Sequence, residues 1–487
     1  MKYGFSLLIY IIFSFSSFGQ LKAYLTYSAF FSPENGPYLE TYLSVIGNSV
    51  KYKKNQSGNF VGSIEITMLF RLGEEIKNFK KYNLSSPEIS DSSQGINFID
   101  QQRFLLPPGT YNFELSVSDN NSSDAPYKSN QPVQIYSDSG KMFFSDLEIL
   151  ESFKPSSEKG ILSKSGFDLV PYVSNFFPKS MEKISFYGEL YNGNRVLGMD
   201  EKFLVNYFIE SFENGTSLPN FRGFLRQSAN PVNVILNSIG ISALPSGNYN
   251  LVLEARNKNN ILLTEKRFFF QRSNPDLQMK PEDISNQSVT GTFVDQINNS
   301  DSLAEYIRSL RPISSETEIR FVENNFSKTD SGTLPLMKKF FLNFWVERNS
   351  IKPETEWDEY KNKVAIVNKA FGTKIKKGYE TDRGRIYLKY GPPNSLIDRP
   401  IEPSNYPYQV WHYYKTERRG NSKFVFFNPD EITNDYQLLH SNVIGEVSDF
   451  RWQYRLQKRN NPSTNLDENK GDEHFGSRPE DFWNNPR

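Results

Sequence analysis

Residues 106–115 read LPPGTYNFEL and residues 244–253 read LPSGNYNLVL, so the phrase L-P-x-G-x-Y-N-x-x-L occurs twice in the chain. Proline presets a turn, glycine accepts the positive φ that many turns need, and the residues that follow suit a β-strand. We expect the glycine of each copy to take a positive φ and the tyrosine to enter the core. The repeat predicts two copies of one β-structured unit and indicates no ligand role.

Alternating apolar residues surround both copies of the phrase. Residues 39–45 (with Thr41), 64–70 and 184–190 (except Gly188) alternate apolar side chains with other residues, as in a strand with one buried face. Short strands separated by turn residues are typical of β-sandwiches. The sequence therefore predicts a multidomain protein that begins with two tandem all-β immunoglobulin-like sandwiches, over residues 21–138 and 140–272.

The composition excludes several kinds of chemistry. The 487 residues include no cysteine, three histidines, and equal numbers of basic and acidic residues, 56 of each. Without cysteine there is no disulfide, thiolate metal site or cysteine nucleophile, and three histidines leave little for a Ser–His–Asp triad. A balanced charge gives no reason to expect nucleic-acid binding. We expect no cofactor, no bound metal and no nucleic-acid partner.

The N-terminus has the pattern of an export signal. Lys2 precedes an apolar run over residues 5–15, and small residues at 17 and 19 suit cleavage before Gln20. A membrane anchor is the alternative, but the run is shorter than the roughly 20 apolar residues that a span requires. We expect a signal peptide over residues 1–19, no later transmembrane segment, and export to the periplasm, the outer-membrane surface or the exterior.

The character of the chain changes after residue 272. Residues 273–299 are rich in Asn, Ser and Gln and predict a linker. Ser315 and Glu318 then have the spacing of a helix capping box, and apolar residues at 357, 360, 364, 367 and 371 form one helical seam after Pro353. Residues 408–414 and 423–427 predict strands. We expect an α+β domain over 300–456 and a polar tail over 457–487, predicted to be disordered except where Phe482 and Trp483 could hold it to the surface.

One segment, GYETDRGRIYLKYGPP at residues 378–393, differs from the rest of the chain. Its alternation predicts a strand that is apolar at 386, 388 and 390 and cationic-aromatic at Arg385, Tyr387 and Lys389. Gly-Pro-Pro would end this strand. Before it, residues 381–384 predict a tight turn in which Asp382 accepts backbone N–H groups and Gly384 takes a positive φ.

This segment resembles the signature of GWxTD domain-containing proteins, a group typical of Bacteroidota. The resemblance extends to KYGPP at 389–393, to the strand around Trp411 and to DYQLLHS at 435–441, and it spans about residues 300–455. The signature tryptophan is Tyr379 here, which keeps an aromatic ring but loses the indole N–H. The resemblance implies an exported or envelope protein and brings no assigned activity.

The candidate binding residues come from this signature: Tyr379, Thr381, Asp382, Arg383, Arg385, Tyr387 and Lys389. One hypothesis is that they present a polar-aromatic face to an anionic, sugar or protein ligand. The other is that Asp382 and the arginines only hold a loop in place.

For the whole protein, the sequence favours a non-enzymatic binding or scaffold protein of the cell envelope that recognises a protein or glycan partner through its C-terminal domain. The alternative is a glycan or peptide hydrolase that uses carboxylates of the same domain, which would require two carboxylates converging near Asp382.

Overall fold

A computed structural model describes residues 21–157, 160, 162–213, 215–284, 288–326, 332–415, 420–449, 451–458, 478–484 and 486. The predicted signal peptide, residues 1–19, lies outside these residues, as does most of the polar tail. The described residues divide into two compact units, which are treated separately below. The first unit comprises the residues up to Ser139 together with Glu148–Ser174, and the second comprises Gly140–Leu147 and the chain from Asn175 onward.

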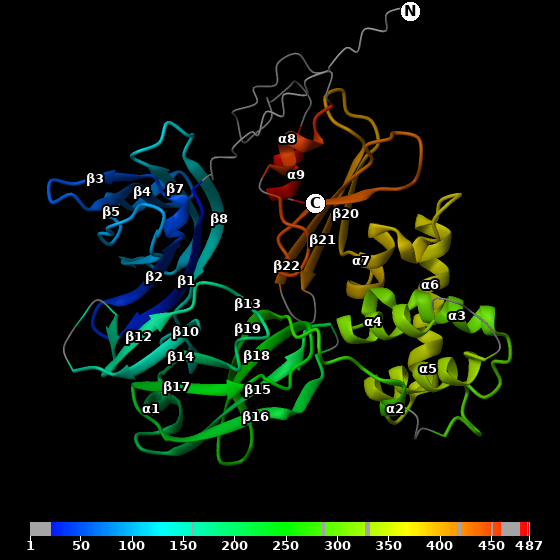
Figure 1. Cartoon of the computed structure of the whole chain (residues 1–487). Helices are drawn as coiled ribbons and strands as arrows, with labels where there is room; N and C mark the ends of the chain where they lie inside the picture. The colour runs from blue at the N-terminus through cyan, green and yellow to red at the C-terminus, as the bar shows by residue number, and fades with distance from the viewer. Residues whose placement is uncertain are drawn as a thin grey trace, which may run out of the picture. The chain divides into compact units, whose positions relative to one another are not determined.

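The first unit is built on a β-sandwich (Figure 1). One antiparallel sheet has the order β1 (Ala23–Ser32), β2 (Gly36–Val45), β6 (Phe98–Leu105), and the short helix η1 (Gly47–Ser49) follows β2. In the other sheet β4 (Phe60–Leu72) pairs with β3 (Tyr52–Lys54), with β5 (Glu75–Ser85) and with β7 (Gly109–Asp119), and β7 pairs with β8 (Tyr127–Ile135). The apolar positions predicted in 39–45 and 64–70, including Leu39, Leu43, Ile66 and Phe70, are buried in the core between them.

The second face of β2 is buried as well, because residues 148–174 cluster with the first sandwich. This segment holds β10 (Glu148–Pro155), β11 (Ser163–Lys164) and β12 (Phe167–Pro171). Lys164 Nζ lies 2.5 Å from Glu40 Oε2 and 2.9 Å from Glu148 Oε2, and Arg103 Nε lies 2.6 Å from Glu40 Oε1. The predicted second sandwich, residues 140–272, includes this segment; residues 148–174 fall in the compact unit of the first sandwich, where Lys164 pairs with the buried Glu40.

The second unit begins with another β-sandwich. One sheet has the order β13 (Phe176–Phe177), β19 (Leu262–Arg272), β18 (Gly247–Arg256), β15 (Lys202–Ser211), β16 (Ser217–Ser228). In the other, β14 (Lys183–Tyr191) pairs with β9 (Phe143–Phe144) and β17 (Val232–Gly240). The short helix α1 (Gly193–Leu197) follows β14. Ile184, Phe186 and Leu190 are fully buried on β14, as predicted, but Ser185, Tyr187 and Glu189 between them are buried too, so both faces of this strand are covered.

The two copies of the repeated phrase have the same local structure. Tyr111, the third residue of β7, donates its hydroxyl to Pro107 O at 2.8 Å, and Tyr249, the third residue of β18, donates to Pro245 O at 3.2 Å. Both tyrosines are buried, as predicted. The positive φ predicted for the glycines is wrong, because neither Gly109 nor Gly247 has one. A Cβ at Gly247 would lie 3.0 Å from the Tyr249 hydroxyl oxygen, so glycine is needed there for room beside the tyrosine.

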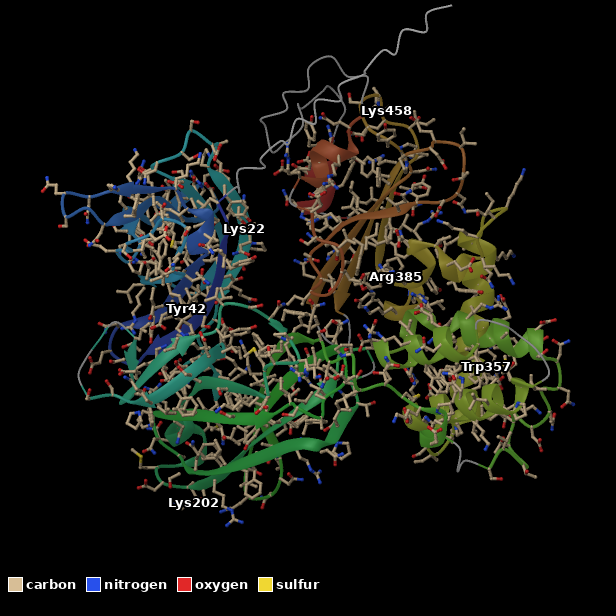
Figure 2. The ribbon with its side chains drawn as sticks, in the orientation of Figure 1. Lys22, Tyr42, Lys202, Trp357, Arg385 and Lys458 are labelled. Carbon is tan, nitrogen blue, oxygen red and sulfur yellow. The ribbon has the colours of Figure 1, made fainter. Side chains whose placement is uncertain are left out.

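The C-terminal part of the second unit starts with helices. These are α2 (Pro281–Ile284), α3 (Ser300–Ser309), η2 (Arg311–Ile313), α4 (Glu316–Asn325), α5 (Leu334–Arg348), α6 (Pro353–Phe371), η3 (Gly378–Glu380) and α7 (Asp382–Tyr390). The predicted capping box of Ser315 and Glu318 begins α4. Pro353 begins α6, and Trp357, labelled in Figure 2, is buried among aromatic side chains of α3 and α5.

The predicted linker contributes to this helical core. Ile284 and Val294 are buried in the same cluster as Trp345 and Trp357. The C-terminal domain therefore begins before residue 300. The Asn- and Ser-rich composition of 273–299 hid these two isolated apolar anchors.

A small antiparallel sheet completes the domain, as predicted. Its order is β20 (Ser395–Arg399), β21 (Tyr408–Lys415), β22 (Gly420–Phe427), β23 (Gln437–Ser441). The short helices α8 (Trp452–Leu456) and α9 (Pro479–Asn484) follow. Trp483 of α9 packs against His440 and Trp452, with ring centroids 4.7 and 5.7 Å apart. The tail is therefore held at Trp483, one of the two aromatic residues for which a surface contact was predicted. No described helix has the length and apolar character needed to cross a membrane.

The strand predicted for 385–390 is wrong, because these residues belong to helix α7. Ile386 and Leu388 fit either period, and a run this short does not distinguish a strand from a helix. Thr381 begins the helix as its N-cap, and Gly391, at φ +81°, follows its last residue. The turn predicted at 381–384 is therefore the helix start, and Gly384 has no positive φ.

The tyrosine hydrogen bonds of the two sandwiches generate a stability prediction. Tyr111→Phe and Tyr249→Phe should each lower the free energy of unfolding by about 1 kcal/mol, because each removes one hydrogen bond and leaves a proline carbonyl unpaired. Urea denaturation measures this, with Tyr24→Phe, at an exposed position, as the matched control. Equal stability of all three variants would contradict the role assigned to the repeat.

Candidate functional site

The signature segment enters helix α7 through a side-chain cap. Thr381 Oγ1 donates to Gly378 O at 2.7 Å and accepts from Gly384 N at 3.1 Å. The Thr381 side chain is buried, so it satisfies helix-end groups that solvent does not reach. Thr381 therefore has a structural role as the cap of α7.

The two glycines of the signature allow unusually close packing. A Cβ at Gly384 would lie 1.8 Å from Gly378 O, and a Cβ at Gly378 would lie 2.1 Å from Val367 O of α6. These distances are far below normal contact, so any side chain would separate α7, η3 and α6. The G-x-x-T-D-x-G spacing thus encodes a backbone contact.

Tyr379 and Asp382 each tie the segment to a distant element. The Tyr379 hydroxyl donates to Glu305 Oε1 of α3 at 3.2 Å, and its ring is buried. Burial raises the pKa of Tyr379, and the nearby Glu305 carboxylate adds to the effect. Asp382 Oδ2 accepts from Leu438 N of β23 at 2.8 Å. Asp382 therefore does accept a backbone N–H, but from a strand 56 residues away and not from its own turn.

Arg383 is buried without an acidic partner in its described contacts. Its Nη2 donates to Asn434 O at 2.6 Å and to Asn434 Oδ1 at 2.5 Å, and its Nη1 donates to Gln409 Oε1 at 3.3 Å. The guanidinium lies over the rings of Tyr436 and Phe371, 4.2 and 5.0 Å from their centroids. Burial lowers the pKa of Arg383. The positive charge of Arg383 is therefore stabilised by neutral oxygen atoms and by the faces of aromatic rings.

Arg385 and Lys389 lie one helical turn apart and share one carboxylate. Arg385 Nη1 is 2.8 Å from Glu446 Oε2, and Lys389 Nζ is 2.8 Å from Glu446 Oε1, which also accepts the Tyr390 hydroxyl at 3.0 Å. Burial by itself raises the pKa of Glu446, but Lys389 and Arg385 outweigh it and hold the pKa below its ordinary value. No sequence pattern pointed to Glu446, which lies 57 residues beyond Lys389.

The cationic-aromatic face predicted for Arg385, Tyr387 and Lys389 does not form. Tyr387 packs against Phe371 of α6, with ring centroids 6.0 Å apart, while Arg385 and Lys389 pair with Glu446. Because the segment is a helix, positions i and i+4 share a face and position i+2 does not. Arg385 is labelled in Figure 2.

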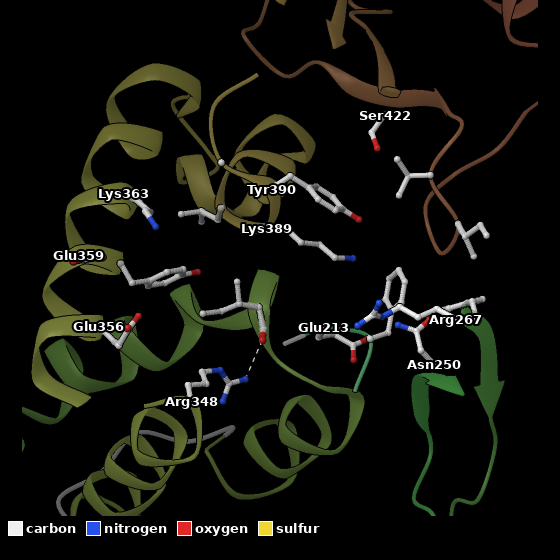
Figure 3. Close-up of a pocket in the computed structure, with 18 of the residues that line it drawn as sticks. Glu213, Asn250, Arg267, Arg348, Glu356, Glu359, Lys363, Lys389, Tyr390 and Ser422 are labelled. Carbon is white, nitrogen blue, oxygen red and sulfur yellow. Dashed lines mark hydrogen bonds between the residues drawn. The ribbon is translucent and has the colours of Figure 1, made fainter. Parts of the chain in front are cut away.

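A cavity of about 540 Å³ lies beside α7, within the second unit. Figure 3 shows Glu213, Asn250 and Arg267 on the sandwich side, Glu356, Glu359 and Lys363 on α6, and Lys389 and Tyr390 between them. Of the predicted residues only Lys389 lines this cavity. The other lining residues come from segments distant in the sequence, so no local pattern pointed to them.

Most charges around the cavity are already paired. Arg348 makes a two-pronged bond to the buried Glu318, at 2.9 and 3.0 Å. Arg267 Nε lies 3.0 Å from Glu210 Oε1, and its Nη1 pairs with Glu265. Burial raises the pKa of Glu213, although hydrogen bonds from Asn248 and Ser211 lower it in part. The site therefore has little unpaired positive charge.

Side chains that commonly bind metal ions are not clustered in the described part of the chain. Among the described residues no group of three or more His, Cys, Asp or Glu is arranged to hold a metal ion. His440 Nδ1 accepts from Asp449 N at 3.0 Å, and burial lowers the pKa of His440 to about 4. His412 Nε2 lies 2.8 Å from Asn421 Oδ1, and His474 is outside the described residues.

β-sandwiches are followed by a C-terminal domain of helices and a small sheet. In that domain, helix α7 begins at the T-D-R-G segment, where a glycine allows close packing. The protein is therefore multidomain, with all-β and α+β parts. Residues 282–455 match the GWxTD domain. The chain therefore contains a GWxTD domain, as the signature residues indicated.

Other comparisons add little. No curated protein matches the chain. Among solved structures, a Bacteroides uniformis β-glucuronidase is 13% identical over 47% of this chain and 26% of its own, with a TM-score of 0.18. Fibronectin(III)-like modules of Clostridium thermocellum CbhA are 12% identical over 50% of this chain and 89% of their own, with a TM-score of 0.15. The chain thus spans about a quarter of the β-glucuronidase, and at these TM-scores neither likeness bears on function.

The glycine contact predicts a strong effect of one methyl group. Gly384→Ala should destabilise the protein by about 3 kcal/mol, because its Cβ meets the Gly378 carbonyl and the packed core relaxes poorly. Gly240→Ala is the matched control, since a Cβ there meets nothing within 4 Å. Thermal and urea denaturation compare the two, and similar stabilities would refute the close contact.

The Glu446 cluster predicts a pH-dependent stability. Because the pKa of Glu446 is lowered by folding, its contribution is fully present above its ordinary value of about 4.5 and is lost as the pH falls through the folded value. Glu446→Gln should cost about 2 kcal/mol near neutral pH and progressively less in acid.

Urea denaturation at about pH 7 and about pH 3 measures the difference. Glu323→Gln serves as the control, because Glu323 pairs with Arg311 at the exposed surface and such pairs contribute at most about 1 kcal/mol. A Glu446→Gln deficit that is independent of pH would contradict the assignment.

Proposed function

We propose that this GWxTD protein is exported to the cell envelope and acts there as a non-enzymatic binding or scaffold protein. The export signal pattern at residues 1–19 supports the location. The C-terminal domain recognises an envelope protein partner through a loop surface that the signature motif organises.

The observation that carries this proposal is how the signature side chains are used. Arg383 holds Asn434, Asp382 holds Leu438, and Lys376 pairs with Asp435 at 2.7 Å. The Lys376–Asp435 pair joins the loop 372–377 to the loop 428–435, and Arg383 anchors the loop 428–435 to α7. The signature side chains thus make contacts within the domain, and the two loops that they help to position lie at its surface.

The tips of these loops expose apolar side chains. Ile375 is 93% exposed and Ile432 is 91% exposed. An isolated exposed isoleucine needs no explanation, but here two project from loops that are joined by an ion pair and anchored by a buried arginine. Apolar side chains on a rigid support, with charged residues around them, suit a protein interface.

The hydrolase alternative draws no support from Asp382. It required two carboxylates converging in a cleft near this residue. Asp382 instead accepts a backbone N–H from β23 and lies 3.8 Å from Arg385 Nε, and it is not among the residues that line the cavity.

Cross-linked pull-down of the tagged protein from its native envelope tests the proposal. We expect a stoichiometric envelope protein to co-purify and its recovery to fall about tenfold or more in Ile375→Ser/Ile432→Ser, since a few buried apolar contacts carry most of an interface's binding energy. Ile401→Ser is the matched control, because Ile401 is equally exposed, at 91%, and lies outside both loops.

Two results would overturn the proposal. One is a partner retained equally by the loop variant and the control. The other is cleavage of an envelope glycan or peptide by the purified chain, which would restore the hydrolase hypothesis.

A further inference from the structure

The cavity beside α7 has the dimensions of a small-molecule site. Its volume of about 540 Å³ falls within the range of roughly 300–1,000 Å³ typical of ligand pockets. It combines side chains from the second sandwich, from α5, α6 and α7 and from the loop after β23. Such a concave junction of several elements is where proteins commonly bind ligands.

Two buried donors at this cavity have no partner. Trp345 Nε1 and Arg348 Nε are buried and make no hydrogen bond to any described residue, and both residues line the cavity. The Trp345 side chain is 2% exposed. A buried donor without a partner costs free energy, which a ligand oxygen would recover.

Acceptors lie on the neighbouring helix. Glu356 and Glu359, three residues apart on α6, line the cavity together with Lys363 one turn further on. Glu356 accepts one bond, from Asn349 Nδ2 at 3.0 Å. The carboxylate of Glu359 and the ammonium of Lys363 form no ion pair within the described part of the chain. A lining that carries both donors and acceptors suits hydroxyl groups, which donate and accept.

The charges disfavour an anionic ligand. The basic side chains are already paired with carboxylates. Arg267 pairs with Glu210 and Glu265, Arg348 with Glu318, and Lys389 with Glu446. The carboxylates of Glu356 and Glu359 would repel a second anion. The remaining groups therefore favour a ligand without net charge.

Aromatic rings supply the apolar part of the lining. Phe212, Phe269, Tyr360 and Tyr390 all contribute, and Lys389 Nζ lies 5.6 Å from the Phe212 ring centroid. Rings beside hydrogen-bonding groups match the two kinds of surface on a sugar, whose C–H faces are apolar and whose edges carry hydroxyls.

We propose that this cavity binds a neutral saccharide, with Trp345 and Arg348 donating to its oxygens and Glu356 and Glu359 accepting from its hydroxyls. The site is distinct from the loops 372–377 and 428–435 to which the protein partner is assigned. A failure of one proposal thus leaves the other to stand on its own experiment.

Titration calorimetry of the purified full chain tests this site. The probes are neutral disaccharides and trisaccharides of glucose, mannose, galactose and N-acetylglucosamine, with oligogalacturonate as the anionic probe and spermidine as the cationic one. We expect saturable binding of a neutral probe. Glu359→Gln and Trp345→Phe should each weaken it about tenfold, as loss of one buried or charged hydrogen bond does.

Glu354→Gln is the matched control, since Glu354 is an exposed α6 carboxylate outside the cavity lining and should leave affinity unchanged. Glu359 is itself exposed, so its variant keeps the test valid even if Trp345→Phe folds poorly. Absence of saturable binding by every neutral probe, equal affinity of Glu359→Gln and the control, or binding of only the anionic or the cationic probe would each overturn the proposal.

Discussion

The C-terminal domain depends on one buried arginine. Arg383 brings a positive charge to a position that solvent barely reaches, where carbonyl and amide oxygens of Asn434 and Gln409 and the faces of Phe371 and Tyr436 receive it. These residues belong to α6, β21 and the loop before β23. Because removing a buried charge from its partners is costly, the guanidinium ties together a helix, a strand and a loop that are otherwise separate in sequence.

Close backbone contact makes that arrangement possible. Gly384 and Gly378 let α7 and η3 approach α6 more closely than any residue with a Cβ could. Arg385, Lys389 and Tyr390 then lie where one buried carboxylate, that of Glu446, engages all three. The signature is thus a packing motif whose polar residues act within the domain. In the functions proposed above, it acts through the loops that it positions and the cavity that Lys389 borders.

The first unit also contains a buried charged residue whose partners are distant in the sequence. Glu40 is fully buried on β2 and meets Lys164 and Arg103. The alternation of β2 correctly indicated a strand, but it could not show that the face carrying Glu40 is covered too. A polar residue at an alternate position normally faces water; here a lysine 124 positions away compensates it.

Local patterns in the sequence determined much of this protein. The period of apolar residues set the strands of both sandwiches and the seam of α6, the repeated phrase set two equivalent tyrosine contacts, and Ser315 with Glu318 set the start of α4. The signature residues indicated the GWxTD domain. Each of these depends on neighbours within a few positions, which is why the chain alone reveals them.

Tertiary structure alone decided the rest. Residues 385–390 fit a strand or a helix equally by period, and only packing of α7 against α6 and β23 selects the helix. Other contacts join residues that are tens to more than a hundred positions apart in the sequence. These are the contacts of α7 with Glu446 and Asn434, and the cavity lined by Glu213, Trp345 and Glu359. Such contacts depend on how the chain folds back on itself, and no local spacing encodes them.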